Sequence, residues 1–565
     1  LLELNADFDS LCDFDNLIAS LQIHEKHVIE KLIDTYENTG KKADIKRIFL
    51  NSLSLAWIEY LESKYPVLRT VNSLRFEKMQ KDLQEEVKNK LKASNEIVLL
   101  RARERTYETV EFNKLNNMVT YRDLSHQVTK KRMIWPIRRV ITTFPDEVFN
   151  LVPCWMASPE SVSAIFPMEQ MFDLVIFDEA SQCFAERGIP AMYRGKQIVI
   201  TGDAQQLSPF DLYKVRWDDE QEDNEELALE VDSLLDLGGK YLMQVQLKGH
   251  YRSKSLDLID FSNQIFYKGN LTLLPDKNIV NSRNPAIEYV KIDGNWEKNK
   301  NIQEAEKVVE IYDQISQIMP DKEIGIITFN AQQQDLILDL LDNYALEKKV
   351  VLPDSLFVKN IENVQGDEKD IIIFSIAYAP DKKGVMRHQF GSLNIQKGEN
   401  RLNVAVTRAR EKVIVVSSIY PQQLKIEDTK NEGPKVLRKY LQYAFDVSEG
   451  RFKPTISPRR HAINWYLKEK IKESVDEKKV KFQFIEEMPF SDLTVKKGDK
   501  YLGLILTDDD LYYQSISIKD MHVYIPFTLS SKNWKFRGIL SREYWHDKEN
   551  VKDILLKFAQ YCDTD

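Results

Sequence analysis

Short apolar runs that each end in a polar cluster recur between Cys154 and Ser418, and a helical pattern follows most of them. These runs are FDLVIF, QIVIT, EIGIIT, DIIIFSIAY and KVIVVSS. Strands of this kind are buried on both faces, and strands that alternate with helices form parallel sheets. We therefore expect an α/β fold. Ligands of such folds bind beyond the carboxyl ends of the strands, so the polar clusters are where we expect the chemistry.

Different sequence patterns occur on both sides of this region, and one acidic run interrupts it. From about Asp9 to Leu100, apolar residues recur at spacings of three and four, which predicts amphipathic helices. The acidic run at 218–226 would repel phosphates and is interpreted as a solvated loop. After Pro454, a helix over 461–473 and strands over 481–485 and 501–506 predict a separate small α/β domain.

Composition limits the class of protein. The chain has 565 residues, enough for three or four domains, and its 43% hydrophobic content is that of a folded protein. Its four widely spaced cysteines exclude a disulfide scaffold and paired zinc spacing, which favours a reducing, cytoplasmic setting. The most apolar segments are only strand-length, so we expect no membrane anchor. With a formal charge of −9, any groove for a polyanion must be local.

Two adjacent carboxylates, Asp178 and Glu179, follow the apolar run Phe172–Phe177. This is a Walker B arrangement. One carboxylate can hold magnesium while its neighbour orients and deprotonates the water that attacks a γ-phosphate. The alternative interpretation is an acidic strand end, which is common in α/β proteins.

Further polar motifs follow in order. The next strand ends in GDAQQLSP from Gly202, where a glycine turn presents Gln206, an amide able to hydrogen-bond a phosphate or its attacking water. Then come HYRS from His250, VQGDEKD from Val364 and RLNVAVTRAR from Arg401. Arginine suits a transferring phosphoryl group because its charge is permanent and its donors form a rigid fork. Taken singly, such arginines are more often surface residues.

The succession of these motifs resembles the Upf1-like (DNA2/NAM7) group of superfamily 1 helicases, in which DEAS, GDxxQLxP, YRS, QGxExD and RLNVAxTRAR occur in this order. The resemblance covers roughly residues 125 to 420. It includes PCWMASP from Pro153, which is similar to the strand-contacting segment before Walker B in large bacterial members.

The resemblance implies an ATP hydrolase that uses ATP and Mg²⁺. It implies Asp178 on magnesium, Glu179 as general base and Gln206 as sensor of the γ-phosphate. Arg252 and Arg408 would be finger residues from the second motor domain. The remaining implied nucleotide-site positions are Gly202, Asp203, Gly366 and Glu368, of which the last two would couple nucleotide to strand.

The same resemblance implies contacts with a single strand of DNA or RNA at Ser158, Asn330 and Gln333. The segment TFNAQQ from Thr328 takes the place of the family's TPYxxQ, with Phe329 and Asn330 where the family has Pro and Tyr. Grip on the strand would come from phosphate contacts and base stacking, which tolerate any sequence. No feature that reads a 2′-hydroxyl decides between DNA and RNA.

A motor of this kind needs GxxxxGK[ST], whose backbone amides and lysine cradle the β- and γ-phosphates. The sequence from Leu1 onward contains no such loop: Gly40-Lys41-Lys42 lacks a Ser or Thr, and Gly195-Lys196-Gln197 comes after Walker B. Two alternatives remain open. We expect the loop to precede Leu1 in the native protein; otherwise the ATPase is degenerate.

The resemblance predicts the domains. Residues 1–125 would be a helical module, an insertion or stalk of the first motor domain. Residues 126–245 would be the rest of that RecA-like domain on its Walker B side, and 246–450 the second RecA-like domain. Residues 451–565 would be a C-terminal domain with a small restriction-endonuclease-like α/β fold.

This last domain resembles the very-short-patch-repair-like nuclease domain of large bacterial relatives, through RRH from Arg459, SDL from Ser491, YLGL from Tyr501 and SREYW from Ser541. In that family, an aspartate and a glutamate on neighbouring strands hold a divalent cation. Asp492 fits the first position, but the second falls on Leu506, which cannot ligate magnesium. We predict an impaired metal site; alternatively, the domain docks the motor or a protein partner.

The expected function is ATP-driven translocation on, or remodelling of, single-stranded nucleic acid. One alternative is a nucleic-acid-sensing ATPase switch, as in antiviral defence, that clamps a strand without processive unwinding. Another is a nucleotide-dead scaffold that binds nucleic acid.

Overall fold

The computed structural model describes residues 2–39, 45–70, 73–112, 114–115, 118–209, 233–282, 284–386, 390–426, 429–453, 455, 466–475, 481–515 and 517–564. The chain divides into two compact units, Leu1–Val87 and Lys88–Asp565. The acidic run at 218–226 and the segment RRH from Arg459 lie outside the described residues. Within the described residues, no helix is both long and apolar enough to cross a lipid bilayer.

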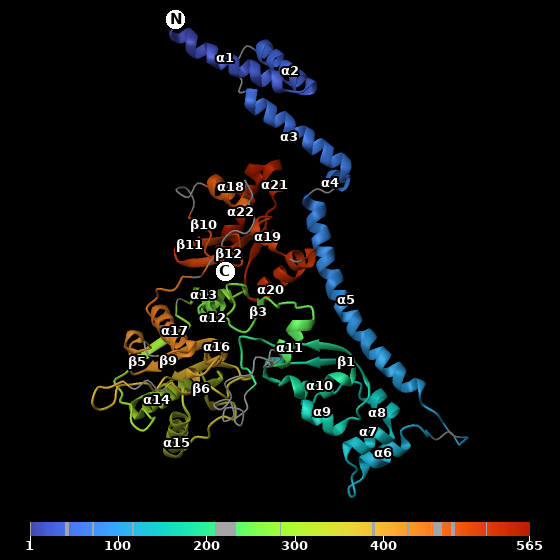
Figure 1. Ribbon diagram of the computed structural model, residues 1–565, viewed down its shortest axis with the longest axis vertical. Helices are drawn as coiled ribbons and strands as arrows, with labels where there is room; N and C mark the ends of the chain where they lie inside the picture. Colours follow the sequence, from blue (N-terminus) through green and yellow to red (C-terminus); the bar gives the residue numbers. More distant parts are fainter. Residues whose placement is uncertain are drawn as a thin grey trace, which may run out of the picture. The chain divides into compact units, whose positions relative to one another are not determined.

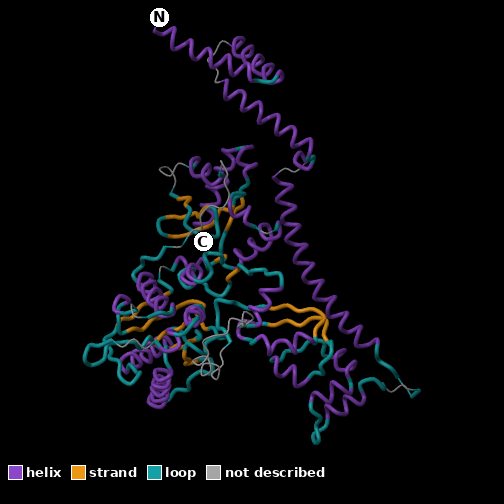
Figure 2. The backbone as a smooth tube through the Cα atoms, viewed as in Figure 1, coloured by secondary structure: helices purple, strands orange, loops and turns teal. Residues whose placement is uncertain are grey.

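The first unit is helical (Figures 1 and 2). Its elements are α1 (Leu2–Ser20), α2 (Ile23–Thr39), α3 (Ile45–Lys64), α4 (Val67–Thr70) and the first part of α5 (Ser73–Glu108). Large apolar side chains on α3 stay exposed, among them Leu55 and Trp57. The described residues between Asp9 and Leu100, where the apolar spacing predicts helices, are mostly helical, and α5 continues beyond the end of this unit.

A small parallel sheet follows four short helices in the second unit. The helices are α6 (Arg122–Thr129), α7 (Ile137–Thr143), α8 (Pro145–Leu151) and α9 (Pro159–Ile165). Strands β1 (Phe172–Phe177) and β2 (Gly195–Ile200) pair in parallel, with Phe177 opposite Ile200. The 3₁₀ turn η1 (Ala180–Gln182) and helix α10 (Ala185–Tyr193) connect them, and α11 (Leu234–Tyr241) packs against α10.

Between this sheet and the next, the chain forms β3 (Gly249–His250), α12 (Asp260–Ile265), β4 (Thr272–Leu273) and α13 (Lys277–Asn281). The larger sheet is parallel throughout and has the strand order β5-β9-β8-β6-β7. Its strands are β5 (Ile287–Lys291), β6 (Ile324–Thr328), β7 (Phe357–Asn360), β8 (Lys369–Ser375) and β9 (Ala409–Ser417). The expected α/β fold with parallel sheets is thus confirmed.

Alternate residues of β8 point to opposite faces of this sheet. Ile371 and Ile373 pack with α14 (Ile302–Ile318) and α15 (Ala331–Lys348). Ile372 and Phe374 pack with α16 (Gly398–Val406) and α17 (Glu432–Ser448) on the other face. Both faces are therefore covered, which explains why the strand reads as a continuous apolar run.

The C-terminal part contains a four-stranded sheet of order β10-β11-β12-β13. Strands β10 (Gln483–Ile485), β11 (Leu493–Lys497) and β12 (Lys500–Leu506) are antiparallel, and β13 (Phe536–Gly538) runs parallel to β12. The accompanying elements are α18 (Leu467–Ser474), α19 (Asp510–Gln514), the π-helix η6 (Asp520–Tyr524), α20 (Ile525–Ser531), α21 (Ser541–His546) and α22 (Lys548–Asp563). Strand β11 was not among the sequence predictions.

Candidate active site

Asp178 lies directly after β1, beside the end of β2. Its Oδ1 accepts hydrogen bonds from the hydroxyl of Thr201 at 2.9 Å and from the backbone N–H of Glu179 at 3.0 Å. These bonds fix the carboxylate at the mouth of the small sheet. Its second oxygen, Oδ2, has no partner among the described residues, an arrangement that suits an oxygen ligand of hydrated magnesium.

Glu179 adopts a left-handed backbone conformation, with φ 51° and ψ 38°. This region is uncommon for residues other than glycine, and strain of this kind concentrates at functional sites. The turn is held by a hydrogen bond from the Ala180 N–H to the Thr201 carbonyl at 2.9 Å. The Glu179 side chain accepts a hydrogen bond from Gln365, with 2.7 Å between Gln365 Nε2 and Glu179 Oε2. Two helicase-like motifs, 186 residues apart, thus meet.

Gly202 begins the polar turn after β2 and lies very close to η1. A Cβ atom there would come within 3.0 Å of the Ser181 backbone nitrogen and 3.1 Å of the Ala180 nitrogen. A side chain would therefore push the two strand-end turns apart. Glycine allows the Walker B turn and the turn that contains Gln206 to pack together.

Asp203 organises this polar turn. Its Oδ2 accepts hydrogen bonds from the Gln206 amide at 3.0 Å and from the Tyr267 hydroxyl at 2.6 Å. Burial, followed by the charge of Asp203, raises the pKa of Tyr267 well above its usual value, so the phenol remains a donor. The NH₂ group of Gln206 is thus directed at Asp203, and its contact with a phosphate stays a prediction.

Helix α16 docks onto the same turn through two asparagines. The Asn400 amide donates to the carbonyls of Ala204 at 3.1 Å and Gln206 at 2.8 Å. The Asn403 amide donates to the Gln205 carbonyl at 2.8 Å and to the Tyr267 hydroxyl at 3.1 Å. The sequence predictions missed Asn400, Asn403 and Tyr267. The asparagine spacing of three, which places both side chains on one helix face, was a usable signal.

Arg252 forms an ion pair inside the second sheet domain. Its Nε lies 2.7 Å from Oε2 of Glu368, and its Nη1 donates to the Thr407 carbonyl at 3.4 Å. The two side chains are 24% and 38% exposed, so this pair remains reachable from solvent. Glu368 therefore holds a predicted finger residue. Gly366, which precedes it by two positions, has φ +86°, a conformation that requires glycine here.

Arg408 is almost fully buried, with 3% exposure. Its guanidinium donates to the Val404 carbonyl at 2.8 Å, the Thr407 hydroxyl at 3.2 Å and the Asp367 carbonyl at 3.4 Å. Burial and then the charge of Arg252 lower the pKa of Arg408 to about 10, whereas Glu179 opposes this shift. The guanidinium remains charged at neutral pH, within electrostatic range of Glu179.

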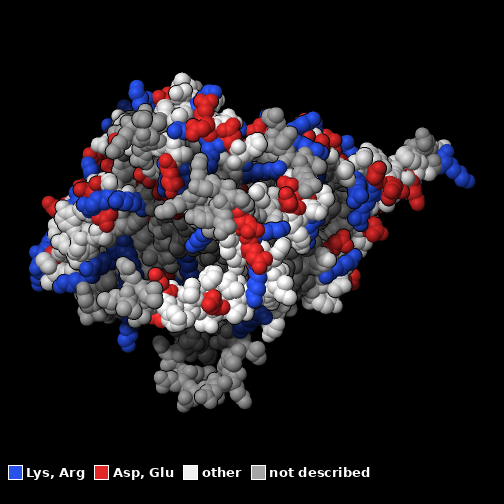
Figure 3. All heavy atoms as spheres, turned by 90° about the horizontal axis from the view of Figure 1, so that it is seen from above, with Lys and Arg blue, Asp and Glu red and all other residues white. Residues whose placement is uncertain are grey.

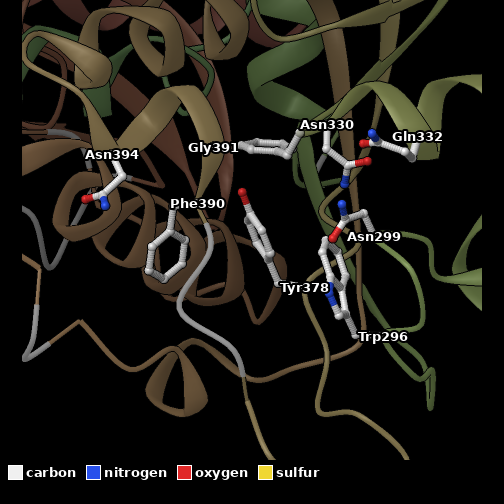
Figure 4. A pocket seen from close by; sticks show the side chains of 9 residues that line it. Trp296, Asn299, Asn330, Gln332, Tyr378, Phe390, Gly391 and Asn394 are labelled. Atoms are coloured by element: carbon white, nitrogen blue, oxygen red, sulfur yellow. The ribbon is translucent and has the colours of Figure 1, made fainter.

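The three predicted strand-contacting residues are placed differently. Ser158 caps α9, where its hydroxyl accepts from the Ser161 N–H at 3.2 Å. Asn330 caps α15 through the Gln333 N–H at 2.8 Å and faces a cavity (Figure 4). Gln333 itself is fully buried, and its amide bonds Asn301 and Ser375. Its side chain is thus used inside the domain, unlike the predicted contact with a strand.

A basic stretch at 130–139 carries five Lys or Arg side chains and no acidic residue. Trp135 stacks on Phe144, with 6.4 Å between centroids, and the Arg139 guanidinium lies 3.9 Å from the Trp135 ring. In the described part of the chain, none of the five cations has a carboxylate partner. On the face drawn in Figure 3, basic and acidic side chains are interspersed. The sequence predictions missed this local basic surface, although the charge run signals it.

The carboxylates of Asp508, Asp509 and Asp510 contact other residues of this chain. Asp508 accepts hydrogen bonds from the backbone N–H and the hydroxyl of Ser541, and Asp509 accepts from the backbone N–H groups of Leu467 and Lys468, both at 2.9 Å. The ammonium group of Lys468 lies 3.0 Å from Glu486 and 3.6 Å from Asp510. Within the described residues, no three His, Cys, Asp or Glu side chains are placed to share a metal ion.

Asp492, the predicted first metal ligand, is buried beside this cluster. Its Oδ2 accepts from the Thr507 N–H at 2.7 Å. Burial, followed by the charge of Asp509, raises its pKa to about 7, whereas the hydrogen bonds with Thr507 and the charge of Lys468 oppose the shift. Leu506, at the second ligand position, is a core residue with 5% exposure.

The C-terminal part shares a hydrophobic core with residues between 256 and 273. Leu256, Ile259 and Leu273 pack with a group from the C-terminal sheet and helices: Met488, Phe490, Leu504, Leu506, Met521, Leu529 and Trp534. Asn281 exchanges two hydrogen bonds with the Tyr501 backbone, at 2.8 and 2.7 Å, and the Trp534 indole donates to the Pro275 carbonyl at 2.7 Å. The expected separate domain is therefore firmly attached to residues that closely follow the HYRS motif.

Two family models, each described as an AAA domain, match residues 23–212 and 232–420. A Mycoplasma genitalium protein named ATP-dependent helicase MG140 is 37% identical over 329 residues, which is 54% of this chain and 29% of that protein. Helicase Sen1 of Saccharomyces cerevisiae is 28% identical over 283 residues, or 46% of this chain and 12% of that one. Together with the motif series, these matches support a Upf1-like superfamily 1 helicase.

The chain spans less than a third of the length of either relative. A solved structure titled "The structure of PRRSV helicase" aligns with 68% of this chain and 50% of that chain, at 13% identity and a TM-score of 0.22.

Proposed function

We propose that this chain forms the motor of an ATP-dependent helicase or translocase that acts on single-stranded DNA or RNA, with ATP hydrolysed between two RecA-like domains. The observation that carries this proposal is the hydrogen bond from Gln365 to Glu179. It joins the candidate general base on the small sheet to a loop of the larger sheet, the connection that a motor driven by domain closure requires.

The proposed chemistry divides between the two sheet domains. Asp178 would hold magnesium, which neutralises charge on the phosphates when bound, and Glu179 would deprotonate the attacking water. Arg252 and Arg408 would stabilise charge that develops on the γ-phosphate. The remaining positions proposed for the nucleotide site are Gly202, Asp203, Gln206, Gly366 and Glu368.

The exposed surface of the small sheet supports a phosphate-binding loop outside the sequence from Leu1 to Asp565. Leu174, Ile176 and Val199 on β1 and β2 are 46%, 62% and 43% exposed. Parallel strands are normally covered on both faces, so apolar exposure of this extent favours further structure against this sheet. We propose that this structure carries the loop.

We propose that the single strand of nucleic acid passes over Ser158, Asn330 and the basic stretch at 130–139. Arg138 of this stretch donates to the Ala164 carbonyl in α9 at 3.4 Å, so the stretch adjoins the helix that Ser158 caps. Lysines and arginines without carboxylate partners suit phosphates, whose neutralisation dominates affinity for nucleic acid.

The C-terminal domain would dock onto the motor as a rigid element, with no nuclease activity of its own. The shared core and the Asn281–Tyr501 hydrogen bonds support this proposal. A protein partner could use the outer surface of the same domain.

The test is hydrolysis of ATP with and without single-stranded DNA or RNA, together with unwinding of a tailed duplex, on protein that includes the phosphate-binding loop. We expect hydrolysis to rise with the strand and the duplex to be unwound. Strand-stimulated hydrolysis without unwinding would instead indicate a sensing switch, and absent ATP binding would indicate a scaffold.

A further inference from the structure

A cavity of about 450 Å³ opens at the carboxyl ends of β6 and β8. These strands are neighbours in the larger sheet, but the chain continues from β6 outward to β7 and from β8 in the opposite direction to β9. Such a switch point leaves a crevice between the two departing connections, and ligands of α/β folds bind there. Phe329 and Asn330 follow β6 into the cavity, and Tyr378 follows β8.

Aromatic rings and amides form the walls of this cavity. The rings of Trp296, Tyr378 and Phe390 lie in a row in Figure 4, with Asn299 and Asn330 above Trp296. The Trp296 and Tyr378 centroids are 5.6 Å apart, and those of Tyr378 and Phe390 are 5.4 Å apart. The lining residues include no Lys, Arg, Asp or Glu: they are Trp296, Asn299, Phe329, Asn330, Gln332, Tyr378, Phe390, Gly391 and Asn394.

Two hydrogen-bond donors at the cavity lack protein acceptors. The Nδ2 atom of Asn330 is buried without a partner, whereas its Oδ1 is used to cap α15. The Tyr378 side chain is only 3% exposed, and its hydroxyl has no hydrogen bond within the described residues. Burial raises the pKa of Tyr378 well above its usual value, which keeps the hydroxyl protonated. The Asn330 donor is buried, and an unpaired buried donor is costly, so the cavity favours a ligand with acceptors.

We propose that this cavity binds one unstacked nucleobase of the bound single strand. A base fits the chemistry because it is planar and carries acceptor atoms on its edge. A phosphate does not fit, since the lining residues carry no cation. Every base has a π-face, so such a pocket holds the strand at one position whatever its sequence. This inference rests on the proposed action on single strands and adds the position at which one base is gripped.

The test uses single-stranded oligonucleotides just long enough to cover the binding site of the protein. They are DNA or RNA, whichever the protein binds more tightly. Each member of the series lacks one base at a different position. Binding is measured for the wild type, for Asn330→Asp and for Tyr378→Phe. Asp retains the cap on α15 but replaces the free donor with a carboxylate, whereas Phe removes only the hydroxyl. Asn343→Asp is the matched control, because it adds the same charge to an exposed site on α15, roughly 20 Å along the helix.

For the wild type, we expect one internal abasic position to weaken binding by roughly 5- to 100-fold, the range for a base stacked on an aromatic side chain. Asn330→Asp should weaken binding of the intact strand and reduce the loss of affinity that the missing base causes at that position. Tyr378→Phe should weaken binding of the intact strand by roughly 2- to 10-fold and reduce the same loss. Asn343→Asp should match the wild type.

A wild-type profile that is flat along the strand, or a penalty unchanged in Asn330→Asp, would overturn the inference and leave the proposed motor function intact. A second result would also overturn the inference: the wild type, but neither variant, binds a free nucleoside, and no abasic position weakens binding of the strand. That result would assign the cavity to free nucleosides. A wild type that fails to bind the intact strand would overturn the motor function, and this inference with it.

Discussion

The side-chain amide of Gln365 donates a hydrogen bond to the carboxylate of Glu179 over 2.7 Å. Gln365 precedes a glycine with φ +86°, and Glu179 has a left-handed backbone conformation of its own. Two constrained turns from different sheets therefore meet at the candidate general base. Movement that separates the two turns would lengthen or break this bond, so in the proposed motor the bond would link strand binding to hydrolysis.

Gln365→Glu tests this route. The substitution places a second carboxylate against Glu179, and like charges at this distance repel. We expect the ratio of hydrolysis rates with and without a saturating single strand to fall on the order of tenfold, with ATP affinity unchanged. Gln422→Glu, an exposed site on the same domain, is the control. An unchanged ratio would show that this contact does not couple the two sites.

Glu179→Gln tests the proposed general base separately from its contact with Gln365. The glutamine oxygen can still accept from Gln365, but the side chain can no longer take a proton from water. Strand-stimulated hydrolysis should fall by a factor on the order of 10² or more, with nucleotide binding preserved. Asp173→Asn at the exposed start of β1 should leave turnover intact. The assay requires protein that includes the phosphate-binding loop, and normal turnover in Glu179→Gln would remove the residue from this role.

Arg408→Ala tests the finger role that we propose for this buried residue. Hydrolysis should fall on the order of 10³, and by more than ATP affinity, because a finger residue acts on transition-state charge. Arg408→Lys should restore little, since lysine lacks the fork that reaches Val404, Thr407 and Asp367. Arg451→Ala, at a half-exposed site, is the control. A loss confined to the unfolding midpoint would make Arg408 structural.

The sequence predicted some parts of the molecule well for identifiable reasons. FDLVIF forms β1 because it is a short apolar run bounded by polar residues, and the apolar run that contains β8 reflects burial on both faces. The order of the motifs indicated the helicase class. These signals are local, or depend on order along the chain, and need no knowledge of long-range contacts.

Other parts depend on contacts between distant residues, which the sequence did not reveal. Gln333 follows a strand-contacting pattern but lies inside the domain, because Asn301, 32 residues earlier, occupies its amide. The pairings of Glu179 with Gln365 and of Arg252 with Glu368 span 186 and 116 residues. The domain after Pro454 shares a core with Leu256, Ile259 and Leu273, and its composition alone gave no sign of this attachment.

Asp492→Asn tests the buried carboxyl of the C-terminal domain. Its pKa, raised to about 7, means that between about pH 4 and pH 7 the folded protein keeps a proton that the unfolded chain has released. The contribution of Asp492 to stability therefore falls as pH rises through this window, by at most roughly 4 kcal/mol. Asparagine can still accept from the Thr507 N–H and does not titrate.

We therefore expect Asp492→Asn to flatten the pH dependence of urea unfolding and to be more stable than the wild type at about pH 8. Asp553→Asn, an exposed site on α22, should leave the pH dependence unchanged. An Asp492→Asn variant that is less stable at about pH 8 would show that the buried carboxylate is charged and stabilised by Lys468.

The protein should leave single- and double-stranded DNA and RNA uncut in the presence of magnesium or manganese. Nuclease chemistry of the predicted kind needs two carboxylates on neighbouring strands to hold the cation. Here the second position is Leu506, which is packed in the core, and Asp508 and Asp509 accept hydrogen bonds from backbone N–H groups. Lys468 is ion-paired with Glu486 and Asp510, and its positive charge acts on Asp492. Cleavage that disappears in Asp492→Ala but persists in Glu179→Gln would contradict this prediction and identify a helicase with an attached nuclease.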